Sequence, residues 1–444
     1  MLRRANQQIV FLSIPFIAIG IVLFPQYWSI FISLFIYILS FSIMSSNSGF
    51  PQVLSPALLF FIFYTIFIYA GSVILAATES KYVLLYIATS SIISFSLGVF
   101  CISKVKGFHA LKEFEIYLSR PIVNNWHNAW FLNSFIFLFF ITLIMVWMYF
   151  KTYGVPLLSE DIQRARTQAI HGSDYYIHFV NILLPFVALT LLARAFFSPS
   201  LITKLFTYLF SIFTALCLVA TAFRSPILHF FIMVIFLSQF LRGFALKRLF
   251  IYGCTGFIIL SILTILRRFK GTAEDFDFVF FNLLIPRLFH RIILVNPLNV
   301  TKISEFIPSA APYMLGKSYI MDIATVAPGP DVGFAGYMTE QAVRVGRTAM
   351  TPTLVGELYA NFGLVGLPIG MFLSGCAVHY LFIWFLRQKR TIGTTVFFSC
   401  VSLWLSKLVM SGWGRTLVIY LFPITITYLL LEMSSRLRIR RTQY

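Results

Sequence analysis

The sequence predicts an all-α polytopic membrane protein with about 12 transmembrane helices. Three observations support this prediction: the composition, the recurring long apolar runs and the uneven distribution of Lys and Arg. The chain has 444 residues, of which 59% are hydrophobic, 18% are aromatic and only 11% are charged. Soluble domains carry about 25% charged residues, so the composition excludes a soluble globular protein. The high hydrophobicity also excludes an intrinsically disordered chain.

The apolar runs predict the helices in order. A spanning helix needs about 20 apolar residues, and we expect spans at 9–24, 27–44, 54–77, 82–102, 129–150, 175–197, 202–222, 226–241, 249–266, 363–386, 394–411 and 416–433. The first run follows Leu2-Arg3-Arg4, which resembles the start of a signal peptide. A second run follows almost at once and no clear cleavage site intervenes, so we expect a retained first span.

The basic residues predict the orientation of these spans. With the N-terminus in the cytoplasm, the cytoplasmic segments hold 18 of the 34 Lys and Arg residues, against 6 in the short outer loops. The positive-inside rule then places both termini in the cytoplasm. Two outer segments are long: 151–174, and 267–362 between the ninth and tenth spans. We expect the whole chain, 1–444, to form a single integral membrane domain.

The net charge of +19 is mostly this topological bias, so we expect membrane lipids and no nucleic acid as partners. No Walker loop, HExxH or GxSxG motif occurs, and the five cysteines form no CxxC pair. Asp275 and Asp277 have a D-x-D spacing that can bind a divalent metal with a diphosphate, although acids at a helix start are also ordinary caps. We expect no cofactor and no metal site.

Two groups of basic residues at the predicted outer face are suited to contact an anion. Arg224 lies between two spans with almost no loop, and Pro226 suits the first turn of the following helix. A guanidinium beside a helix N-terminus favours an anion. Three residues of a nearly apolar outer segment stand at i, i+3 and i+4 and so share one helical face: Arg287, His290 and Arg291. Either group would also serve as an anchor to lipid phosphates.

The most specific stretch of the sequence runs from 351 to 366. On a helix, Thr353, Glu357 and Asn361 fall at i, i+4 and i+8 and form one polar stripe. The stripe leads into a span with the small-xxx-small spacing of tight helix packing, formed by Gly366, Gly370 and Ser374. A carboxylate at a membrane boundary is costly unless it has a partner or a task. We therefore expect Glu357 to pair with an arginine or to act as a base.

This stretch, followed by Leu367-Pro368-Ile369-Gly370, resembles the signature of bacterial oligosaccharide repeat-unit polymerases, the Wzy-type O-antigen and common-antigen polymerases. The Arg224 turn, the arginines of the third and fifth outer loops and the Gly414-Arg415 pair near the last outer turn are similar as well. The resemblance in architecture covers the whole chain, whereas the specific motifs cover about a tenth of it.

The resemblance implies a GT-C-like glycosyltransferase of the bacterial inner membrane with its active site on the periplasmic side. It would transfer a glycan chain from undecaprenyl diphosphate to a lipid-linked repeat unit in O-antigen, common-antigen or other surface polysaccharide (lipopolysaccharide) biosynthesis. The implied catalytic residues are Glu357 as the base, with Arg224, Arg287 and Arg291 on the diphosphate. The implied substrate-binding residues are Arg164, Arg166, His290, Thr353, Asn361 and Arg415. The implied partners are undecaprenyl diphosphate-linked oligosaccharides and a chain-length-regulating co-polymerase.

Two other functions stay open at this point. An O-antigen ligase would have the same fold with a different acceptor, and ligases use a His in the long outer loop, where His290 is the only one. A transporter or flippase would carry charged residues in the middle of its spans and would have two similar halves. Here Arg194 and Lys407 are the clearest charges inside apolar runs, and each lies near an end.

Overall fold

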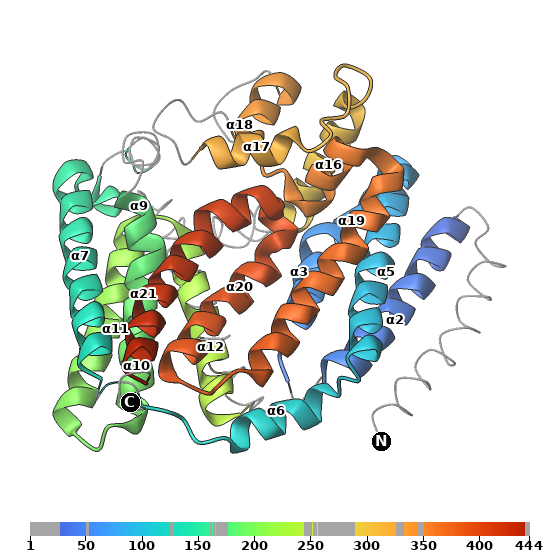
Figure 1. The fold of residues 1–444 in the computed structure, drawn as a ribbon. Helices are drawn as coiled ribbons and strands as arrows, with labels where there is room; N and C mark the ends of the chain where they lie inside the picture. Colours follow the sequence, from blue (N-terminus) through green and yellow to red (C-terminus); the bar gives the residue numbers. More distant parts are fainter. Residues whose placement is uncertain are drawn as a thin grey trace, which may run out of the picture. The chain divides into compact units, whose positions relative to one another are not determined.

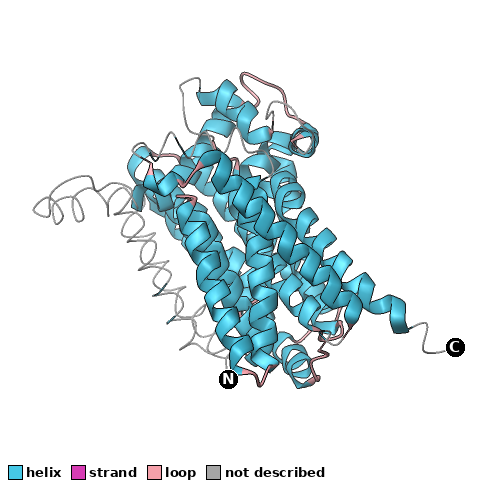
Figure 2. Cartoon of the chain, turned by 90° about the vertical axis from the view of Figure 1, so that its left-hand side faces the viewer, coloured by secondary structure: helices cyan, strands magenta, loops and turns pink. Residues whose placement is uncertain are grey.

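The computed structural model describes residues 27–49, 53–124, 126, 128–159, 162, 165, 176–243, 251, 255, 289–325, 333–343 and 350–439. The predicted span 9–24 and nearly all of 249–266 lie outside the described residues. Five candidate functional residues named above also lie outside the described residues: Arg164, Arg166, Asp275, Asp277 and Arg287. Helices make up the described part of the chain, where the β structure is one isolated bridge between Val123 and Thr391 (Figure 2).

Ten helices of the described residues are long and apolar enough to cross a membrane. They are Trp28–Ser48, Pro56–Glu79, Tyr82–Val105, Ala129–Leu158, Tyr176–Phe197, Leu201–Ala220, Ser225–Arg242, Thr353–Arg387, Ile392–Ser411 and Trp413–Glu432. Each overlaps one of the predicted spans. The prediction of an all-α, multi-pass membrane protein is therefore confirmed at these ten positions.

The chain divides into two compact units. Unit 1 comprises residues 1–114, 275–386 and 404–418, and unit 2 comprises 115–274, 387–403 and 419–444. The helices of unit 1 are α2 (Trp28–Ser48), α3 (Pro56–Tyr64), α4 (Ala70–Glu79), α5 (Tyr82–Val105), α16 (Val295–Phe306), α17 (Lys317–Ala324), α18 (Phe334–Met338) and nearly all of α19 (Thr353–Arg387). Short π-helical turns interrupt this set: η2 (Thr65–Tyr69), η8 (His290–Leu294) and η9 (Thr339–Val343).

The helices of unit 2 are α7 (Ala129–Tyr153), α9 (Tyr176–His178), α10 (Leu184–Phe197), α11 (Leu201–Ala220), α12 (Arg224–Arg242) and α21 (Phe422–Ile439), with the short turns η4 (Pro156–Leu158) and η5 (Phe179–Leu183). Three elements pass from one unit to the other: α6 (Ala110–Ser119), α20 (Ile392–Arg415) and η10 (Thr416–Leu421). Pro226 lies in the first turn of α12, as predicted.

Polar caps begin several of these helices. Ser55 accepts a hydrogen bond from the Leu58 N–H at the start of α3, where Pro56 takes the first helical position. The Asn128 side chain accepts from the Trp130 N–H at the start of α7. Such caps satisfy N–H groups that have no partner inside the helix. They therefore fix where an apolar run becomes a helix.

One face of α7 carries large exposed apolar side chains. Trp130 is 60% exposed and Trp147 is 59% exposed, and exposed apolar residues follow the same face between them: Phe137, Phe140 and Ile144. Seventeen residues at about 1.5 Å per residue separate the two tryptophans by roughly 25 Å, close to the hydrocarbon thickness of a bilayer, about 30 Å. Tryptophan favours the two membrane interfaces, so this face is suited to contact lipid.

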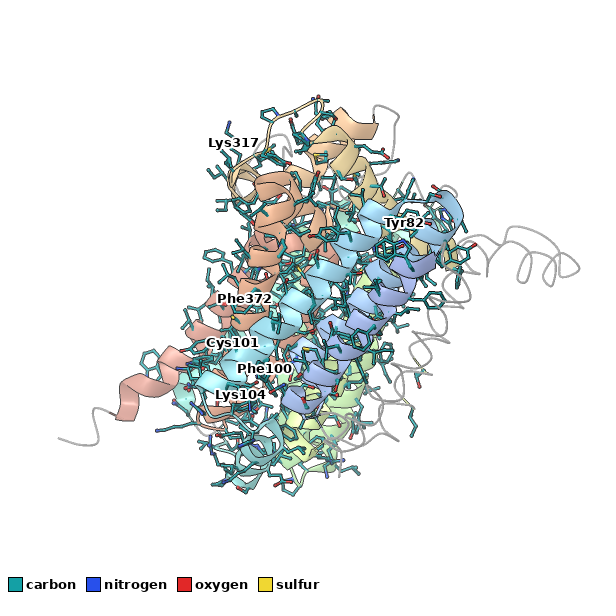
Figure 3. The ribbon with its side chains drawn as sticks, turned by 90° about the vertical axis from the view of Figure 1, so that its right-hand side faces the viewer. Tyr82, Phe100, Cys101, Lys104, Lys317 and Phe372 are labelled. Carbon is teal, nitrogen blue, oxygen red and sulfur yellow. The ribbon has the colours of Figure 1, made fainter. Side chains whose placement is uncertain are left out.

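In unit 1, α5 and α19 cross with their backbones in contact. A Cβ on Gly98 of α5 would collide with the Phe372 carbonyl oxygen of α19, and a Cβ on Gly375 would collide with the Phe95 carbonyl oxygen. Small residues permit such close approach between membrane helices. Figure 3 shows Phe372 beside α5, between Lys317 at one end of unit 1 and Lys104 at the other. The two reciprocal glycines thus hold α19 in a fixed position on α5.

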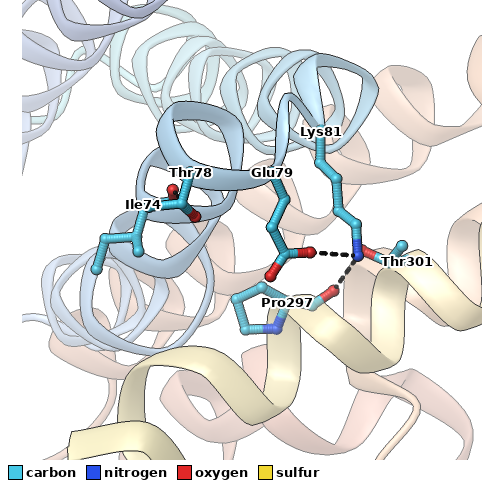
Figure 4. Close-up of polar contacts among 6 residues, drawn as sticks. All are labelled: Ile74, Thr78, Glu79, Lys81, Pro297 and Thr301. Carbon is cyan, nitrogen blue, oxygen red and sulfur yellow. Dashed lines mark hydrogen bonds and ion pairs between the residues drawn. The ribbon is translucent and has the colours of Figure 1, made fainter.

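The elements α16, α17 and α18 gather at one end of the long helices of unit 1 (Figure 1). The turn from α4 to α5 joins this end. Ser80 adopts a left-handed conformation there, with φ 55°. Its neighbours Lys81 and Glu79 form an ion pair with an N–O distance of 2.9 Å, beside Pro297 of α16 (Figure 4). The segment 267–362, predicted as a long outer loop, therefore contains packed helices in its described part.

Candidate functional site

Two long helices of the protein are broken at a glycine. In α19 the break is at Gly363, with φ 64° and ψ −163°. In α20 it is at Gly412, with φ 73° and ψ 176°. Residues other than glycine rarely adopt a positive φ. The breaks separate a short first part of α19, 353–362, from the rest of that helix, and they let a new helix begin at Trp413.

Glu357 joins these two breaks. Its side chain is fully buried, with 0% exposure, on the short first part of α19. Its Oε2 accepts a hydrogen bond from the Trp413 N–H at 2.6 Å, and its Oε1 accepts one from the Gly414 N–H at 3.2 Å. These N–H groups are the first of the helix that follows Gly412, where a helix has unpaired donors and favours negative charge. The carboxylate therefore caps that helix.

The space around the Glu357 carboxylate explains the second role of Gly412. A Cβ at this position would lie 2.5 Å from Glu357 Oε2, closer than any real contact of that kind. Gly412 is thus required both for its backbone conformation and for the approach of the carboxylate. Glu357 makes no ion pair with an arginine within the described residues. Among the described residues, the partners of the Glu357 carboxylate are backbone N–H groups.

Asp322 of α17 brings a second carboxyl group to the same turn. The side chain is 5% exposed, and its Oδ1 accepts a hydrogen bond from the Phe334 N–H at 2.9 Å. A Cβ on Gly414 would lie 2.5 Å from Asp322 Oδ2 and 3.1 Å from Glu357 Oε1. Both carboxyl groups therefore face Gly414. Asp322 is absent from the residues predicted for the site, although it is a lone acid in the otherwise uncharged segment 318–330 that precedes Asp331.

The two other members of the predicted polar stripe are also fully buried. Thr353 accepts a hydrogen bond from the Gly356 N–H at 3.1 Å and so caps α19. Asn361 accepts from the Gly316 N–H at 2.8 Å. Its amide group donates to Ser318 Oγ at 2.6 Å and to the Glu357 carbonyl oxygen at 2.8 Å. Asn361 thereby ties α17, which carries Asp322, to the helix that carries Glu357.

Tyr319 of α17 also lies close to this site. Burial raises the pKa of its phenol, and the negative charge of Glu357 raises it further. The tyrosine therefore stays protonated at physiological pH, as a hydroxyl group near Glu357. Within the described residues, no group of three or more His, Cys, Asp or Glu side chains is arranged to hold a metal ion.

The predicted basic residues have different positions. Arg415 directly follows Gly414 and is half-buried, and its guanidinium makes no hydrogen bond or ion pair with the described residues. His290 and Arg291 lie in η8 with exposed side chains, and they too make no such bond with the described part of the chain. Arg224 is the first residue of α12 in unit 2. Thr353, Glu357, Asn361 and Arg415 all lie in unit 1: the first three are on the short first part of α19, and Arg415 follows the Gly414 that contacts Glu357.

Comparison of the chain with protein-family models, curated proteins and solved structures gives no match. The chemistry of the site therefore has to be judged from its own residues. These are two buried carboxyl groups, a helix break that exposes backbone N–H groups, and a guanidinium that follows the break by three residues.

Proposed function

We propose that this protein is a glycosyltransferase that polymerises lipid diphosphate-linked oligosaccharide repeat units at the periplasmic face of the bacterial inner membrane. The observation that carries the proposal is the buried Glu357 carboxylate, bound at a helix break inside a multi-pass membrane protein. Ionisable groups at such depth are costly and mark functional sites. Glu357 also lies in the stretch 351–366, whose sequence resembles oligosaccharide repeat-unit polymerases.

The proposed reaction uses these residues as follows. A sugar hydroxyl of the acceptor attacks the anomeric carbon of the donor glycan, and the bond from that carbon to the lipid diphosphate breaks with its electron pair on the diphosphate. Glu357 accepts the proton of the attacking hydroxyl. Arg415 stabilises the negative charge that grows on the diphosphate. Arg224, Arg287 and Arg291 are proposed as further diphosphate ligands on the basis of the sequence resemblance alone.

A gene deletion tests this function. We expect the surface glycan of the deletion strain to collapse from a ladder to a single repeat unit. Wild-type protein should restore the ladder and Glu357→Gln should not, at equal protein level. Glu340→Gln changes an exposed acid of unit 1 and serves as the matched control that restores the ladder. An unchanged ladder in the deletion strain would refute the polymerase function, and loss of every glycan band would favour a ligase or a flippase.

A transporter is the second candidate, because one observation favours it. Two discontinuous helices, broken at Gly363 and Gly412, meet at a buried carboxylate, and secondary transporters build ion and substrate sites from such helices. Purified protein in liposomes without an ion gradient separates the two functions. A polymerase lengthens lipid-linked repeat units under these conditions. A transporter leaves the glycan length unchanged and moves substrate only when a gradient is applied.

A further inference from the structure

The helix α17 (Lys317–Ala324) has its polar face inside the protein and its apolar face outside. Ser318 and Asp322 lie four residues apart on the buried face, with exposures of 0% and 5%. Ile320 and Ile323 lie on the opposite face, with exposures of 67% and 58%. A helix at a water-facing surface has the reverse arrangement, with its apolar side buried and its polar side exposed. The outer face of α17 is therefore suited to an apolar environment.

Hydrogen bonds on the buried face fix this orientation of α17. Ser318 Oγ accepts a hydrogen bond from the Asn361 amide group at 2.6 Å, and Asp322 accepts one from the Phe334 N–H at 2.9 Å. A rotation of α17 that buried its isoleucines would break both bonds, and buried polar groups that lose their partners are costly. The exposure of the apolar face is therefore built into the fold.

The apolar face of α17 continues an exposed apolar stripe of α19. Val365, Ile369 and Leu373 follow one another at four-residue intervals in this candidate span, and each is more than half exposed. Exposed apolar side chains along a spanning helix contact lipid. Leu315, two residues before α17, is 77% exposed, and its N–H donates to the Asn361 carbonyl oxygen of α19 at 3.2 Å. Leu315 thus joins the apolar surface of the span to that of α17.

The length of α19 places this junction at the edge of the membrane. Residues 364–387, which follow the break at Gly363, form a helix roughly 36 Å long, against a hydrocarbon thickness of about 30 Å. The break, and α17 beside it, therefore lie near an interface between lipid and water. Lys317 is exposed at the start of α17, at one end of unit 1 (Figure 3). Lysine at such a position extends its ammonium group to lipid phosphates.

We propose that α17 lies in the membrane interface, with phospholipid as the partner of Leu315, Ile320 and Ile323. Interfacial helices bury their apolar face about 5–10 Å into the boundary between headgroups and acyl chains. This lipid contact does not depend on the glycosyltransferase function. The buried face of the same helix supplies Asp322, which lies with Glu357 against Gly414. Phospholipid thus packs against the helix that brings a carboxyl group to the candidate site.

Photo-crosslinking of the full-length protein in phospholipid nanodiscs, with a single copy in each disc, tests this partner. The photoreactive residue p-benzoylphenylalanine replaces Ile320 or Ile323 in separate variants. The same replacement of Leu373 on the span is the positive control, and that of Glu305, an exposed acid on α16, is the control for a polar surface. We expect phospholipid adducts, identified by mass, at 320, 323 and 373, and their loss at 305.

Other outcomes would overturn the proposal. Lipid adducts that are missing at 320 and 323, or equally abundant at 305, would show that phospholipid does not select the apolar face of α17. The same variants in native membranes report other occupants of that face. A product of twice the protein mass in place of the lipid adduct would assign the face to a second copy. A product with a different protein, or with a polyprenyl lipid alone, would assign it to that molecule instead of the bilayer.

Hydroxyl-radical labelling of the wild-type protein in the same nanodiscs needs no substitution. The radicals form in water, so side chains covered by lipid are protected from oxidation. Leu315, Ile320 and Ile323 should be oxidised as little as Leu373, the residue on the exposed stripe of the span. Oxidation of these three side chains several-fold above that of Leu373 would mean that water covers the face, and this result would overturn the proposal.

Discussion

Unit 1 and unit 2 each contain a buried charged side chain that is bound by helix ends, but the two charges are opposite. In unit 2, the Arg390 guanidinium donates to the carbonyl oxygens of Phe240 and Leu241 in the last turn of α12, at 2.9 Å each. It also donates to the Leu118 carbonyl oxygen at 2.6 Å and to that of Arg120 at 3.0 Å. In unit 1, the Glu357 carboxylate accepts two N–H groups at the start of a helix.

Arg390 and Glu357 differ in how many of their hydrogen-bonding positions are occupied by backbone groups. The two terminal nitrogen atoms of Arg390 donate to four carbonyl groups at the ends of two helix segments. The guanidinium carbon of Arg390 lies over the Tyr117 ring, 5.3 Å from the ring centroid. A carboxylate has about four acceptor sites, and the backbone fills two of those on Glu357. Arg390 is therefore a structural connection. Among its contacts with the described residues, Glu357 keeps acceptor capacity, and a second carboxyl group lies on the same glycine, Gly414.

The largest expected effect concerns the catalytic role of Glu357, the buried charge of unit 1. Glu357→Gln should lower the chain-extension rate by about 10²- to 10⁴-fold, the usual contribution of a general base. Arg390→Lys, which keeps the charge in unit 2, should leave the rate per folded molecule close to that of the wild type. The measurement is the extension of lipid-linked repeat units by purified protein, normalised to folded protein. A Glu357→Gln rate near the wild-type rate would remove Glu357 from the chemistry.

The next largest effect concerns the structural role of Arg390, the buried charge of unit 2. Arg390→Ala leaves carbonyl groups of unit 2 without their donor, and each buried unsatisfied group costs about 1–3 kcal/mol. We expect a loss of roughly 3–5 kcal/mol in the free energy of unfolding. Arg390→Lys should fall between alanine and wild type, because an ammonium lacks the planar fork. Unfolding of the protein in detergent micelles measures both changes, and an alanine variant as stable as the wild type would contradict the structural role.

A smaller effect is expected to differ between two turns, each of which contains a glycine with a positive φ. Gly412→Ala strains a residue at φ 73° and pushes a Cβ against Glu357 Oε2. Gly243→Ala is the matched control in unit 2, where φ is 82° and the nearest contact is Leu118 Cδ1 at 3.3 Å. Both should lose about 1–3 kcal/mol from backbone strain, because φ is positive at each position and ψ is 176° at Gly412 and 166° at Gly243, but only Gly412→Ala should also reduce glycan extension. Equal extension by the two variants would show that the carboxylate tolerates displacement.

The smallest effect concerns the start of α19. Thr353→Ala removes the side-chain oxygen that accepts the Gly356 N–H, and loss of such a cap costs about 1 kcal/mol. Thr353→Ser keeps that oxygen and is the matched control. The melting temperatures of the two variants should therefore differ by about 1 °C, because the entropy of unfolding grows with chain length. Identical unfolding would mean that the short first part of α19 needs no cap to hold Glu357 in place.

Particular residues show which parts of the fold can be predicted from the sequence. Hydropathy predicts the long helices because each apolar run has to be buried or face lipid, and Pro226 marks a helix start through its fixed φ. The start of α19 is different. Hydropathy places it at 363, where the polar stripe ends, but the helix begins at Thr353 because that side chain caps it and the stripe is buried against α17.

The partners of Glu357 lie beyond sequence patterns for a physical reason. Its hydrogen bonds go to backbone N–H groups 56 and 57 residues away, and backbone groups are identical at every position until the chain conformation exposes them. The Gly-Trp-Gly sequence permits the break at Gly412 but does not require it. Asp322 is near Glu357 only because Asn361 and Ser318 hold α17 in place. No local period in the sequence records that contact.

The close packing of α5 and α19 at Gly98 and Gly375 has a consequence for the order in which the protein assembles. These two positions are separated by most of the chain, and ribosomes add about 5–20 residues per second. The glycine face of α5 is therefore synthesised on the order of tens of seconds before α19, which packs on it. A chain that ends before α19 would leave the Gly98 face of α5 without the helix that packs on it.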